Sequence, residues 1–449
     1  MKRENLRVAA YTLGCKVNQY ETEAVIRLFA ERGYQIVRFE EQADIYLINT
    51  CSVTAESDRK NRQIIRRAVK RNPEAVIAVM GCYSQAAPQE AAILGVDILI
   101  GTQNRASLLS LVEARLRERT RCATEILPMI QVKNEIFKER SLPFEPLSIR
   151  RMDGHTRAFV KIQDGCTQFC TYCIIPYTRG TVRSRPIDEI RREAEQLAAH
   201  GYREIVLCGI HLSSYGKDLA DRPRLSDAVH TVAAVNGIVR VRLGSMEPMY
   251  LTEEVIQELA GIESFCRQFH ISLQSGSADV LRRMNRRYTP EEYADIAALL
   301  RRYMPDCAIT TDVMVGFPGE TEAEFEESFH FVEQIAFSRI HVFPFSRRKG
   351  TAAWSMAGQV PADVKKERAA RMHGLALALE RRFMESLLGK REEMLVETSR
   401  ENGMCCGYGG NYVKILLRDS EKILPGMLIP VIIDEVFGDY CIGYDARTQ

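Results

Sequence analysis

Three cysteines close together in the middle of the chain have a spacing suited to an iron–sulfur cluster. Cys166, Cys170 and Cys173 form the pattern C-x3-C-x2-C. Three thiolates on one tight loop can bind three irons of a [4Fe–4S] cube, which leaves the fourth iron open to a substrate or cofactor. A closed zinc site needs four ligands and haem attachment needs C-x-x-C-H, but no fourth Cys or His lies nearby and Ile174 follows Cys173. Three unrelated buried cysteines are the remaining alternative.

Three further cysteines lie far apart in the sequence but share a local context. Cys15, Cys51 and Cys82 each follow an apolar segment, and they are 36 and 31 residues apart, about one βαβ unit each. Right-handed crossovers place the carboxyl ends of parallel strands on one edge of a sheet, where open α/β sheets bind ligands. If the strands are neighbours, the thiols converge and bind a second cluster, which Gly14 and Gly81 would allow to approach the backbone. Buried cysteines that merely share a layer are the alternative.

The first part of the chain, residues 3–118, alternates apolar runs with amphipathic helical patterns. Such an alternation is typical of a parallel sheet that is covered on both faces. We therefore predict an α/β domain that carries Cys15, Cys51 and Cys82 at the carboxyl ends of its strands. Residues 119–150 contain three prolines and no clear period, which predicts a linker. The predicted strands are Leu6–Leu13, Asp44–Ile48, Ala75–Met80 and Val96–Ile100.

A second alternation of strands and helices runs through residues 151–384. About six strand candidates alternate with helical patterns, which fits a partly closed (βα)6 barrel or a doubly wound sheet. In both architectures, function is expected where the strands end at their carboxyl termini. The candidates are Ala158–Gln163, Glu204–Cys208, Val239–Leu243, Phe269–Leu273, Ile309–Met314 and Ile340–Phe343.

The sequence pattern changes again for residues 385–447, where short alternating strands are separated by glycines. This pattern predicts a small all-β module, an OB-like barrel. The predicted strands are Glu393–Thr398, Tyr412–Leu417, Met427–Glu435 and Tyr440–Tyr444.

Length and composition agree with three soluble domains. At about 150 residues per domain, 449 residues correspond to roughly three. The formal net charge of +2 means that any nucleic-acid surface must be local. No apolar run reaches the roughly 18 residues that a membrane span needs, and the first apolar stretch is better read as a strand than as a secretory signal. We therefore expect a cytoplasmic protein that is not associated with a membrane.

The motif at Cys166–Cys173, with the aromatic Tyr172 before its last cysteine, resembles that of radical S-adenosylmethionine (SAM) enzymes. In that superfamily the open iron binds the amino and carboxylate groups of SAM, and reductive cleavage yields a 5′-deoxyadenosyl radical. The protein positions and secludes that radical. The resemblance implies that Tyr172 lies against the SAM adenine; the alternative is an ordinary packed loop tyrosine.

Together with the upstream cysteines and the downstream β-module, this motif resembles the methylthiotransferase family over essentially the whole chain. The stretches Thr12–Glu21 (TLGCKVNQYE) and Asn49–Thr54 (NTCSVT) are most similar to the branch that modifies N6-threonylcarbamoyladenosine beside the tRNA anticodon. Other branches act on isopentenyladenosine in tRNA or on a ribosomal-protein aspartate. The resemblance implies two [4Fe–4S] clusters and two uses of SAM. One SAM methylates sulfur held on the Cys15/Cys51/Cys82 cluster, and a second generates the radical that activates C2 of the adenine for methylthio transfer.

The resemblance also suggests residues and partners beyond the six cysteines. Polar residues at strand ends, namely Ser245, Glu247, Gln274 and Asp312, would bind SAM, although turn capping explains them equally well. The terminal module resembles a TRAM domain, an RNA-binding fold. The implied partners are the tRNA anticodon stem-loop and an electron donor such as flavodoxin or ferredoxin. An RNA-binding iron–sulfur protein without catalysis is the alternative from another functional class.

Several basic and aromatic residues are candidates for RNA contacts, although a run of charges is usually a solvated face. The remaining cysteines lack cluster spacing, and we expect them to pack in the core. The basic candidates are Arg59, Lys60, Arg62, Arg66, Arg67, Lys70 and Arg71, and also Arg282, Arg283, Arg286 and Arg287. The candidates in the terminal module are Tyr408, Tyr412 and Lys414.

Overall fold

The computed structural model describes residues 6–121, 127–139, 142–401, 404–418 and 423–447. These residues form two compact units, and each unit has its own hydrophobic core. The first unit contains the chain up to Arg151 together with Gln163–Arg185 and Ser346–Trp354. The second unit contains Met152–Ile162, Pro186–Phe345 and the chain from Ser355 onward.

The first unit is built on a parallel six-stranded sheet with the strand order β2-β1-β3-β4-β5-β6. Every residue of β3 and β4 is buried, as expected for central strands that are covered on both faces. The predicted parallel sheet is confirmed. Its strands are β1 (Arg7–Thr12), β2 (Gln35–Val37), β3 (Ile45–Thr50), β4 (Val76–Gly81), β5 (Ile98–Ile100) and β6 (Met129–Gln131).

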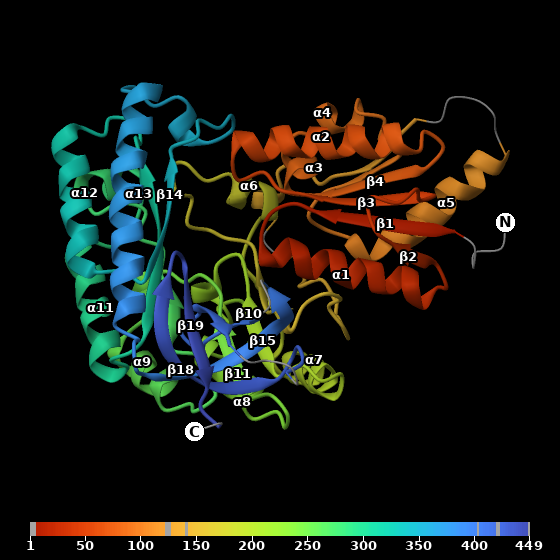
Figure 1. Cartoon of the computed structure of the whole chain (residues 1–449). Coiled ribbons are helices and arrows are strands. Elements are labelled where there is room, and N and C mark those ends of the chain that lie inside the picture. Colours follow the sequence, from red (N-terminus) through yellow and green to blue (C-terminus); the bar gives the residue numbers. More distant parts are fainter. Residues whose placement is uncertain (1–5, 122–126, 140–141, 402–403, 419–422, 448–449) are drawn as a thin grey trace. The chain divides into compact units, whose positions relative to one another are not determined.

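Helices cover both faces of this sheet (Figure 1). α1 (Lys16–Glu31) and α5 (Leu108–Arg121) pack on one face through Val25, Phe29 and Val112. On the other face, α2 (Ala55–Arg71), α3 (Cys82–Ala86) and α4 (Pro88–Ala92) share a second core cluster. Alternate residues of each central strand point to opposite faces, so the two clusters draw on the same strands.

Two short edge strands were not predicted from the sequence. β2 and β6 have three residues each, too few to show a period. β6 lies within the stretch expected to be a linker, and Leu147 of that stretch accepts a hydrogen bond from the Tyr20 hydroxyl (2.7 Å). This part of the chain therefore belongs to the first unit through contacts that are distant in sequence.

A loop between two short antiparallel strands completes the first unit. β8 (Gln163–Asp164) pairs with β9 (Arg183–Ser184), and the loop that they enclose contains α6 (Ile175–Arg179). The 3-10 helix η6 (Ala352–Trp354) contacts this loop, because the Ala353 N–H donates to the Thr171 carbonyl (2.8 Å).

The second unit contains six parallel strands in two sheets, β7-β10-β11 and β12-β13-β14. Isolated parallel bridges, such as Val241 with Phe265, connect the two sheets. The strands therefore follow one another in space in their chain order, as in a partly closed barrel, whereas a doubly wound sheet reverses its order at a switch point. The predicted partial (βα)6 barrel is confirmed. The strands are β7 (Arg157–Lys161), β10 (Glu204–Cys208), β11 (Arg240–Leu243), β12 (Gln268–His270), β13 (Ala308–Val315) and β14 (Arg339–Pro344).

Helices follow the strands of this barrel, and a longer helix leads from it to the last module. α12 begins with a capping box in which Thr321 accepts from the Glu324 N–H (3.2 Å) and Glu324 accepts from the Thr321 N–H (2.8 Å). The helices are α7 (Ile187–Ala199), α8 (Leu225–Ala233), α9 (Glu253–Ala260), α10 (Ala278–Arg283), α11 (Pro290–Tyr303), α12 (Glu322–Ile335) and α13 (Ala362–Glu385).

The last part of the second unit is a closed five-stranded barrel with the order β15-β16-β17-β19-β18. The predicted small β-barrel is confirmed, but β16 was not predicted because glycines interrupt its sequence. A Cβ at Gly407 would lie 2.2 Å from the Leu395 carbonyl oxygen, so glycine is required by the close approach of the neighbouring strand. The strands are β15 (Arg391–Glu401), β16 (Met404–Tyr408), β17 (Lys414–Leu417), β18 (Leu428–Phe437) and β19 (Tyr440–Asp445).

Candidate cluster-binding site

Three cysteines follow three neighbouring strands of the first unit. β1, β3 and β4 are adjacent, and Thr50 pairs in register with Gly81, so Cys51 and Cys82 are the next residues of two paired strands. Cys15 comes just before α1, after the carboxyl end of β1. Cys51 and Cys82 are buried and Cys15 is exposed. The three strands are neighbours, which is the condition for convergence, and this places the three cysteines at one edge of the sheet.

Two glycines with left-handed backbone conformations allow the strand ends to approach closely. A Cβ at Gly14 (φ +112°) would lie 2.9 Å from the Cys51 Cβ, and one at Gly81 (φ +107°) would lie 2.5 Å from the Thr50 carbonyl oxygen. Burial, together with the nearby thiols of Cys82 and Cys15, raises the pKa of Cys51 to about 11. The other two thiols therefore lie close enough to Cys51 to influence its protonation.

The same thiols do not form a closed metal site by themselves. Among the residues that the structure describes, no three Cys, His, Asp or Glu side chains stand at the spacing of a metal-ion site. Three cysteine donors nevertheless lie at one sheet edge, next to glycine backbone and the buried guanidinium of Arg179. This arrangement matches what a [4Fe–4S] cluster with one open iron requires. The donor set fits the cluster, and the assignment of Cys15, Cys51 and Cys82 as its ligands remains a prediction.

The second trio lies on the loop between β8 and β9. Gly165 (φ +75°) precedes Cys166, and a Cβ there would lie 1.9 Å from a backbone carbonyl oxygen, so only glycine fits. The Cys166 N–H donates to the Gly180 carbonyl (3.0 Å), and the Cys173 N–H donates to the Cys170 carbonyl (2.9 Å). All three cysteines are partly exposed. A single loop that is closed at its neck thus carries the three donors of the C-x3-C-x2-C pattern.

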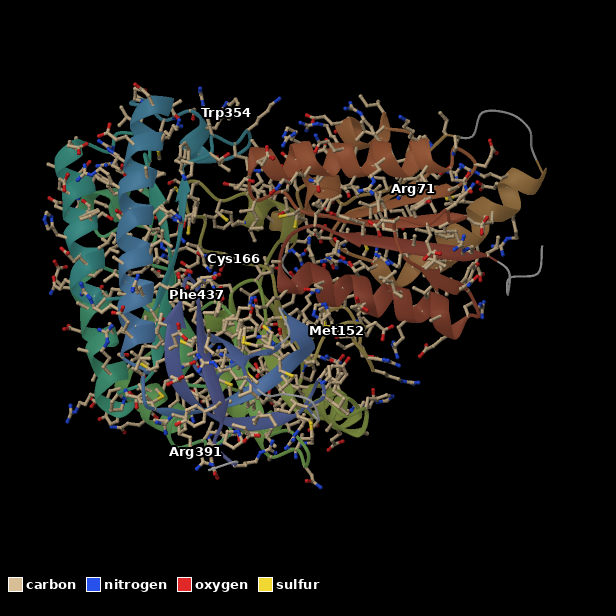
Figure 2. The ribbon with its side chains drawn as sticks, in the orientation of Figure 1. Arg71, Met152, Cys166, Trp354, Arg391 and Phe437 are labelled. Atoms are coloured by element: carbon tan, nitrogen blue, oxygen red, sulfur yellow. The ribbon has the colours of Figure 1, made fainter. Side chains whose placement is uncertain are left out.

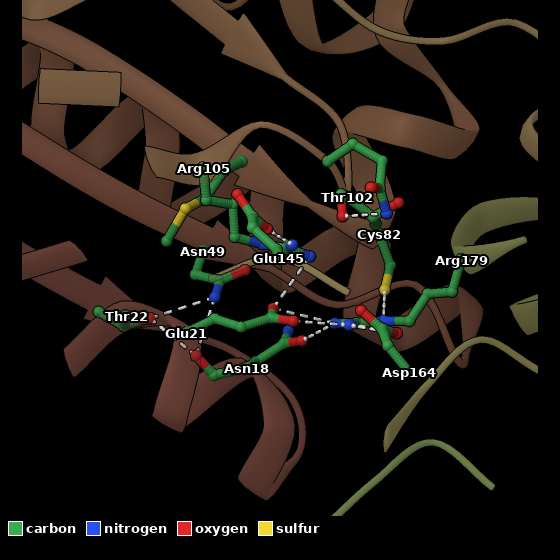
Figure 3. A network of polar contacts seen from close by, with 12 residues as sticks. Asn18, Glu21, Thr22, Asn49, Cys82, Thr102, Arg105, Glu145, Asp164 and Arg179 are labelled. Carbon is green, nitrogen blue, oxygen red and sulfur yellow. Dashed lines mark hydrogen bonds and ion pairs between the residues drawn. The ribbon is translucent and has the colours of Figure 1, made fainter. Parts of the chain in front are cut away.

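A buried arginine links Cys82 to the neck of the second cysteine loop within the first unit (Figure 3). Arg179, at the end of α6, is fully buried and donates from Nε to the Cys82 Sγ (3.4 Å). Its Nη1 donates to Glu21 of α1 (2.7 Å) and to Asp164 of β8 (3.1 Å), and its Nη2 donates to Asn18 (2.6 Å). One side chain therefore holds together the helix after Cys15, the cysteine after β4 and the neck of the second cysteine loop.

The charge of Arg179 is compensated inside this network. Burial opposes the charge, but the carboxylates of Glu21 and Asp164 outweigh burial and raise the pKa of Arg179 well above its usual value. Glu21 also pairs with Arg105 (3.1 Å), and Asp164 also pairs with Arg183 (3.2 Å). A permanent cation of this kind favours the thiolate form of a cysteine, which is the form that binds iron. Sequence reasoning missed Arg179 because its partners lie up to 161 residues away.

Four of the five residues predicted to bind SAM lie in the second unit, namely Ser245, Glu247, Gln274 and Asp312. The fifth, Tyr172, lies in the first unit and is partly exposed. Ser245 is exposed. Glu247 forms an ion pair with Arg286. Burial raises the pKa of Glu247, and the guanidinium of Arg286 opposes that shift. Asp312 lies 3.2 Å from the Nε2 atom of His270.

Gln274 has two features that distinguish it from an ordinary turn residue. Its backbone adopts the left-handed region (φ +69°), which is uncommon for residues other than glycine. Its Oε1 atom is buried and has no hydrogen-bond partner among the described residues. Buried polar atoms are almost always hydrogen-bonded in native proteins, so this oxygen is suited to a ligand. Its backbone pairs with β13, because the Gln274 N–H donates to the Asp312 carbonyl (2.8 Å).

The structure places the aromatic candidates of the terminal barrel beside arginines of the same unit. Tyr408 and Tyr412 stack on one another with ring centroids 5.2 Å apart. The guanidinium of Arg157 lies 5.0 and 4.8 Å from the two ring centroids, and that of Arg242 lies 4.5 Å from Tyr412. Both rings therefore pack against arginines of β7 and β11, and their role in RNA contacts stays a prediction. Lys414 lies over the ring of Tyr440 (5.7 Å).

Most of the basic RNA candidates also have partners within the protein. On α2, Arg67 and Arg71 lie over the ring of Phe39, and Arg59 pairs with Glu56. The exposed cations that remain on this helix are Lys60, Arg66 and Lys70. Arg282, Arg283 and Arg286 form ion pairs with Asp279, Glu324 and Glu247.

The expectation that the other cysteines pack in the core is confirmed for those that the structure describes; Cys122 lies outside the described residues. The buried cysteines are Cys208, Cys266, Cys307, Cys405, Cys406 and Cys441.

Comparison with known proteins agrees with this site. The family described as "Radical SAM superfamily" matches residues 160–332, and "Uncharacterized protein family UPF0004" matches residues 7–101. The chain is 44% identical to "Threonylcarbamoyladenosine tRNA methylthiotransferase MtaB" of Bacillus subtilis, covering 95% of this chain and 93% of the relative. The chain belongs to the radical SAM methylthiotransferase family. Members of this family use S-adenosylmethionine and two [4Fe–4S] clusters, and the two cysteine trios are the predicted ligands of those clusters.

Other relatives also match most of the chain. MtaB of Aquifex aeolicus is 37% identical and covers 95% of this chain and all of the relative's length. A Clostridium botulinum protein named tRNA-2-methylthio-N(6)-dimethylallyladenosine synthase is 36% identical and covers 87% of this chain and 86% of its own. The structure resembles the radical SAM methyltransferase TsrM from Kitasatospora setae (TM-score 0.58, 16% identity, 79% of this chain and 74% of that chain), which shows the fold alone. Within the described residues, no helix is long and apolar enough to cross a bilayer.

Proposed function

We propose that this chain is a tRNA methylthiotransferase that adds a methylthio group to C2 of N6-threonylcarbamoyladenosine beside the anticodon. The observation that carries the proposal is the presence of two cysteine trios, one at three strand ends and one on a single loop, in a chain of this family. The choice of substrate is supported by the two MtaB relatives at 44% and 37% identity. When bound, SAM and the clusters supply the methyl group, the sulfur and the carbon-centred radical.

We assign separate tasks to the two trios. Cys166, Cys170 and Cys173 would hold the cluster that binds SAM, on a loop whose neck is closed by β8 and β9. The cysteines at positions 15, 51 and 82 would hold the second cluster, and Arg179 supports it with a hydrogen bond to a ligand sulfur. Hydrogen bonds and cations beside cluster sulfurs stabilise the reduced cluster and tune its potential.

We further propose that Tyr172, Ser245, Glu247, Gln274 and Asp312 contact SAM. The support is strongest for Gln274, whose buried amide oxygen can accept a hydrogen bond from an amino or hydroxyl group. Glu247 is a carboxylate that follows a strand end, where ligands are commonly bound in α/β folds, and Asp312 is a carboxylate within β13.

The proposal assigns each segment of the chain a role. Residues 3–118 carry the second cluster, and residues 119–150 are the linker to the next domain. Residues 151–384 form the radical SAM core, and residues 385–447 form a TRAM-like RNA-binding module. The partners are the anticodon stem-loop and an electron donor such as flavodoxin or ferredoxin, and the location is the cytoplasm. The candidates of the terminal module for RNA contacts are Tyr408 and Tyr412, which pack against arginines of β7 and β11, and Lys414.

The test is an anaerobic assay of the reconstituted protein with SAM, dithionite and purified tRNA. Nucleoside mass spectrometry should detect the methylthio group on tRNA that carries N6-threonylcarbamoyladenosine, and on no other substrate. The product on isopentenyladenosine tRNA alone would reassign the branch, and a ribosomal-protein product would reassign the substrate class. A protein that binds RNA but releases no 5′-deoxyadenosine from SAM would support the non-catalytic alternative. A Cys82→Ala variant that still forms the methylthio product would contradict the role of the second trio.

A further inference from the structure

The first unit contains a polar groove that the six cysteines do not occupy. Its volume is about 730 Å³. Its walls come from the start of α2, from α3 and α4, from α6 and from the segment 347–354, all of which belong to the first unit. The residues that matter for its chemistry are Asp58, Arg62, Glu90, Arg347, Arg348, Lys349 and Trp354.

One wall of the groove presents an aromatic ring with a cation beside it. Trp354, labelled in Figure 2, is 39% exposed, which is high for so large an apolar side chain. The guanidinium of Arg347 lies 4.6 Å from the Trp354 ring centroid, and its Nε donates to the Trp354 carbonyl (2.7 Å). Flat aromatic and guanidinium surfaces in an open groove are what unpaired nucleic-acid bases stack on.

The charge of the groove is suited to phosphate. Four basic side chains line it, against two carboxylates. Arg348 is 6% exposed and is held by an ion pair to Asp58 (3.0 Å) and a hydrogen bond to Ser52. Its Nε atom is buried without a hydrogen-bond partner among the described residues. Arg62, Arg347 and Lys349 add cations that are partly or fully exposed.

Two residues that line the groove are close in the sequence to Cys173 and Cys82. Ile174, which lines it, directly follows Cys173 in the sequence, and Gln85, which also lines it, is three residues after Cys82. The segment that carries Trp354 also holds the second cysteine loop, through the hydrogen bond to the Thr171 carbonyl. The walls of the groove thus continue directly from the segments that carry Cys82 and Cys173.

We propose that this groove binds a single-stranded RNA loop, with an unpaired base stacked on Trp354 and the neighbouring phosphates on Arg62, Arg347 and Lys349. The inference rests on the proposed function for the identity of the RNA, the anticodon loop, and adds the surface that grips it. Single-stranded RNA suits the site because splayed bases can stack there, whereas the bases of a duplex are stacked on one another.

Trp354 is the one tryptophan of the chain, so its fluorescence reports this site directly. We would titrate the holoenzyme with an anticodon stem-loop RNA and with a duplex RNA of equal length, and follow total binding by anisotropy of the labelled RNA. The stem-loop should quench Trp354 and the duplex should not. Trp354→Ala should weaken stem-loop binding about 5- to 150-fold, as expected for the loss of one stacked base. Lys349→Ala should weaken binding and reduce its salt dependence.

A matched control is Tyr303→Ala, which removes another ring that an arginine covers, Arg302 at 5.5 Å, from α11. This variant should bind the stem-loop as the wild type does. Stem-loop binding that leaves Trp354 fluorescence and the affinity of Trp354→Ala unchanged would overturn the groove and leave the proposed function standing. A protein that binds no RNA by anisotropy would overturn both.

Discussion

Replacing Arg179 with methionine, which keeps much of its volume and removes its charge, tests the network that links Cys82 to the neck of the second cysteine loop. The substitution leaves the side chains of Glu21 and Asp164, which are 0% and 4% exposed, with one cation fewer each. Removing one partner of a buried ion pair costs about 3–5 kcal/mol. Because each carboxylate keeps another arginine, we expect the lower end, about 3 kcal/mol of lost unfolding free energy.

Urea unfolding of the full chain measures this loss when it is followed by the fluorescence of Trp354. Trp354 belongs to the same compact unit as Arg179, so its signal reports the unfolding of that unit. Arg66→Met is the matched control, because Arg66 is exposed on α2, and such a change is expected to stay within about 0.5 kcal/mol. Adding Glu21→Gln to Arg179→Met should recover part of the loss, since it removes a buried carboxylate that has lost one of its two cations. A loss below about 1 kcal/mol for Arg179→Met would refute the reasoning.

Three further predictions concern other parts of the chain. Burial raises the pKa of Glu392 to about 7, so the folded protein keeps a proton that the unfolded chain releases near pH 4.5. Stability should therefore fall as the pH rises from about 4.5 to 7, and Glu392→Gln should flatten that dependence in unfolding titrations. Gly165→Ala places a Cβ against a carbonyl oxygen, and should lose about half of the bound iron in an iron assay of the reconstituted protein, whereas Gly154→Ala, at an open position, should not. Tyr412→Ala should destabilise the second unit by about 2 kcal/mol in thermal unfolding, and Tyr412→Phe should not; equal stability of both variants would contradict the packing role of the ring.

The sequence was informative where burial on both faces dictates the pattern. Continuous apolar runs predicted the central strands of the first sheet, and all six strands of the barrel overlap the predicted segments. The placement of the carboxyl ends before Cys15, Cys51 and Cys82 on one edge of the sheet followed from the handedness of crossovers, whereas the adjacency of the three strands came from the structure. The edge strands β2 and β6 and the glycine-containing β16 lack a readable period, so local pattern could not predict them.

Contacts between segments that are far apart in the chain could not be predicted from the sequence. Arg179 meets Glu21 across 158 positions, and neither residue differs locally from an exposed helical one. The same holds for Tyr412, whose role depends on Arg157 and Arg242 of another module. The groove likewise exists because the segment around Trp354 packs with the first unit, far from its neighbours in the chain.

Iron counting on anaerobically purified protein tests most directly whether the chain holds two clusters on two trios. The wild type should contain about eight irons per chain, and replacing Cys166, Cys170 and Cys173 together with alanine should leave about four. Replacing Cys15, Cys51 and Cys82 together should also leave about four, with the spectrum of the other cluster. A wild type with about four irons, all of which are lost when the trio at positions 166, 170 and 173 is removed, would contradict the account.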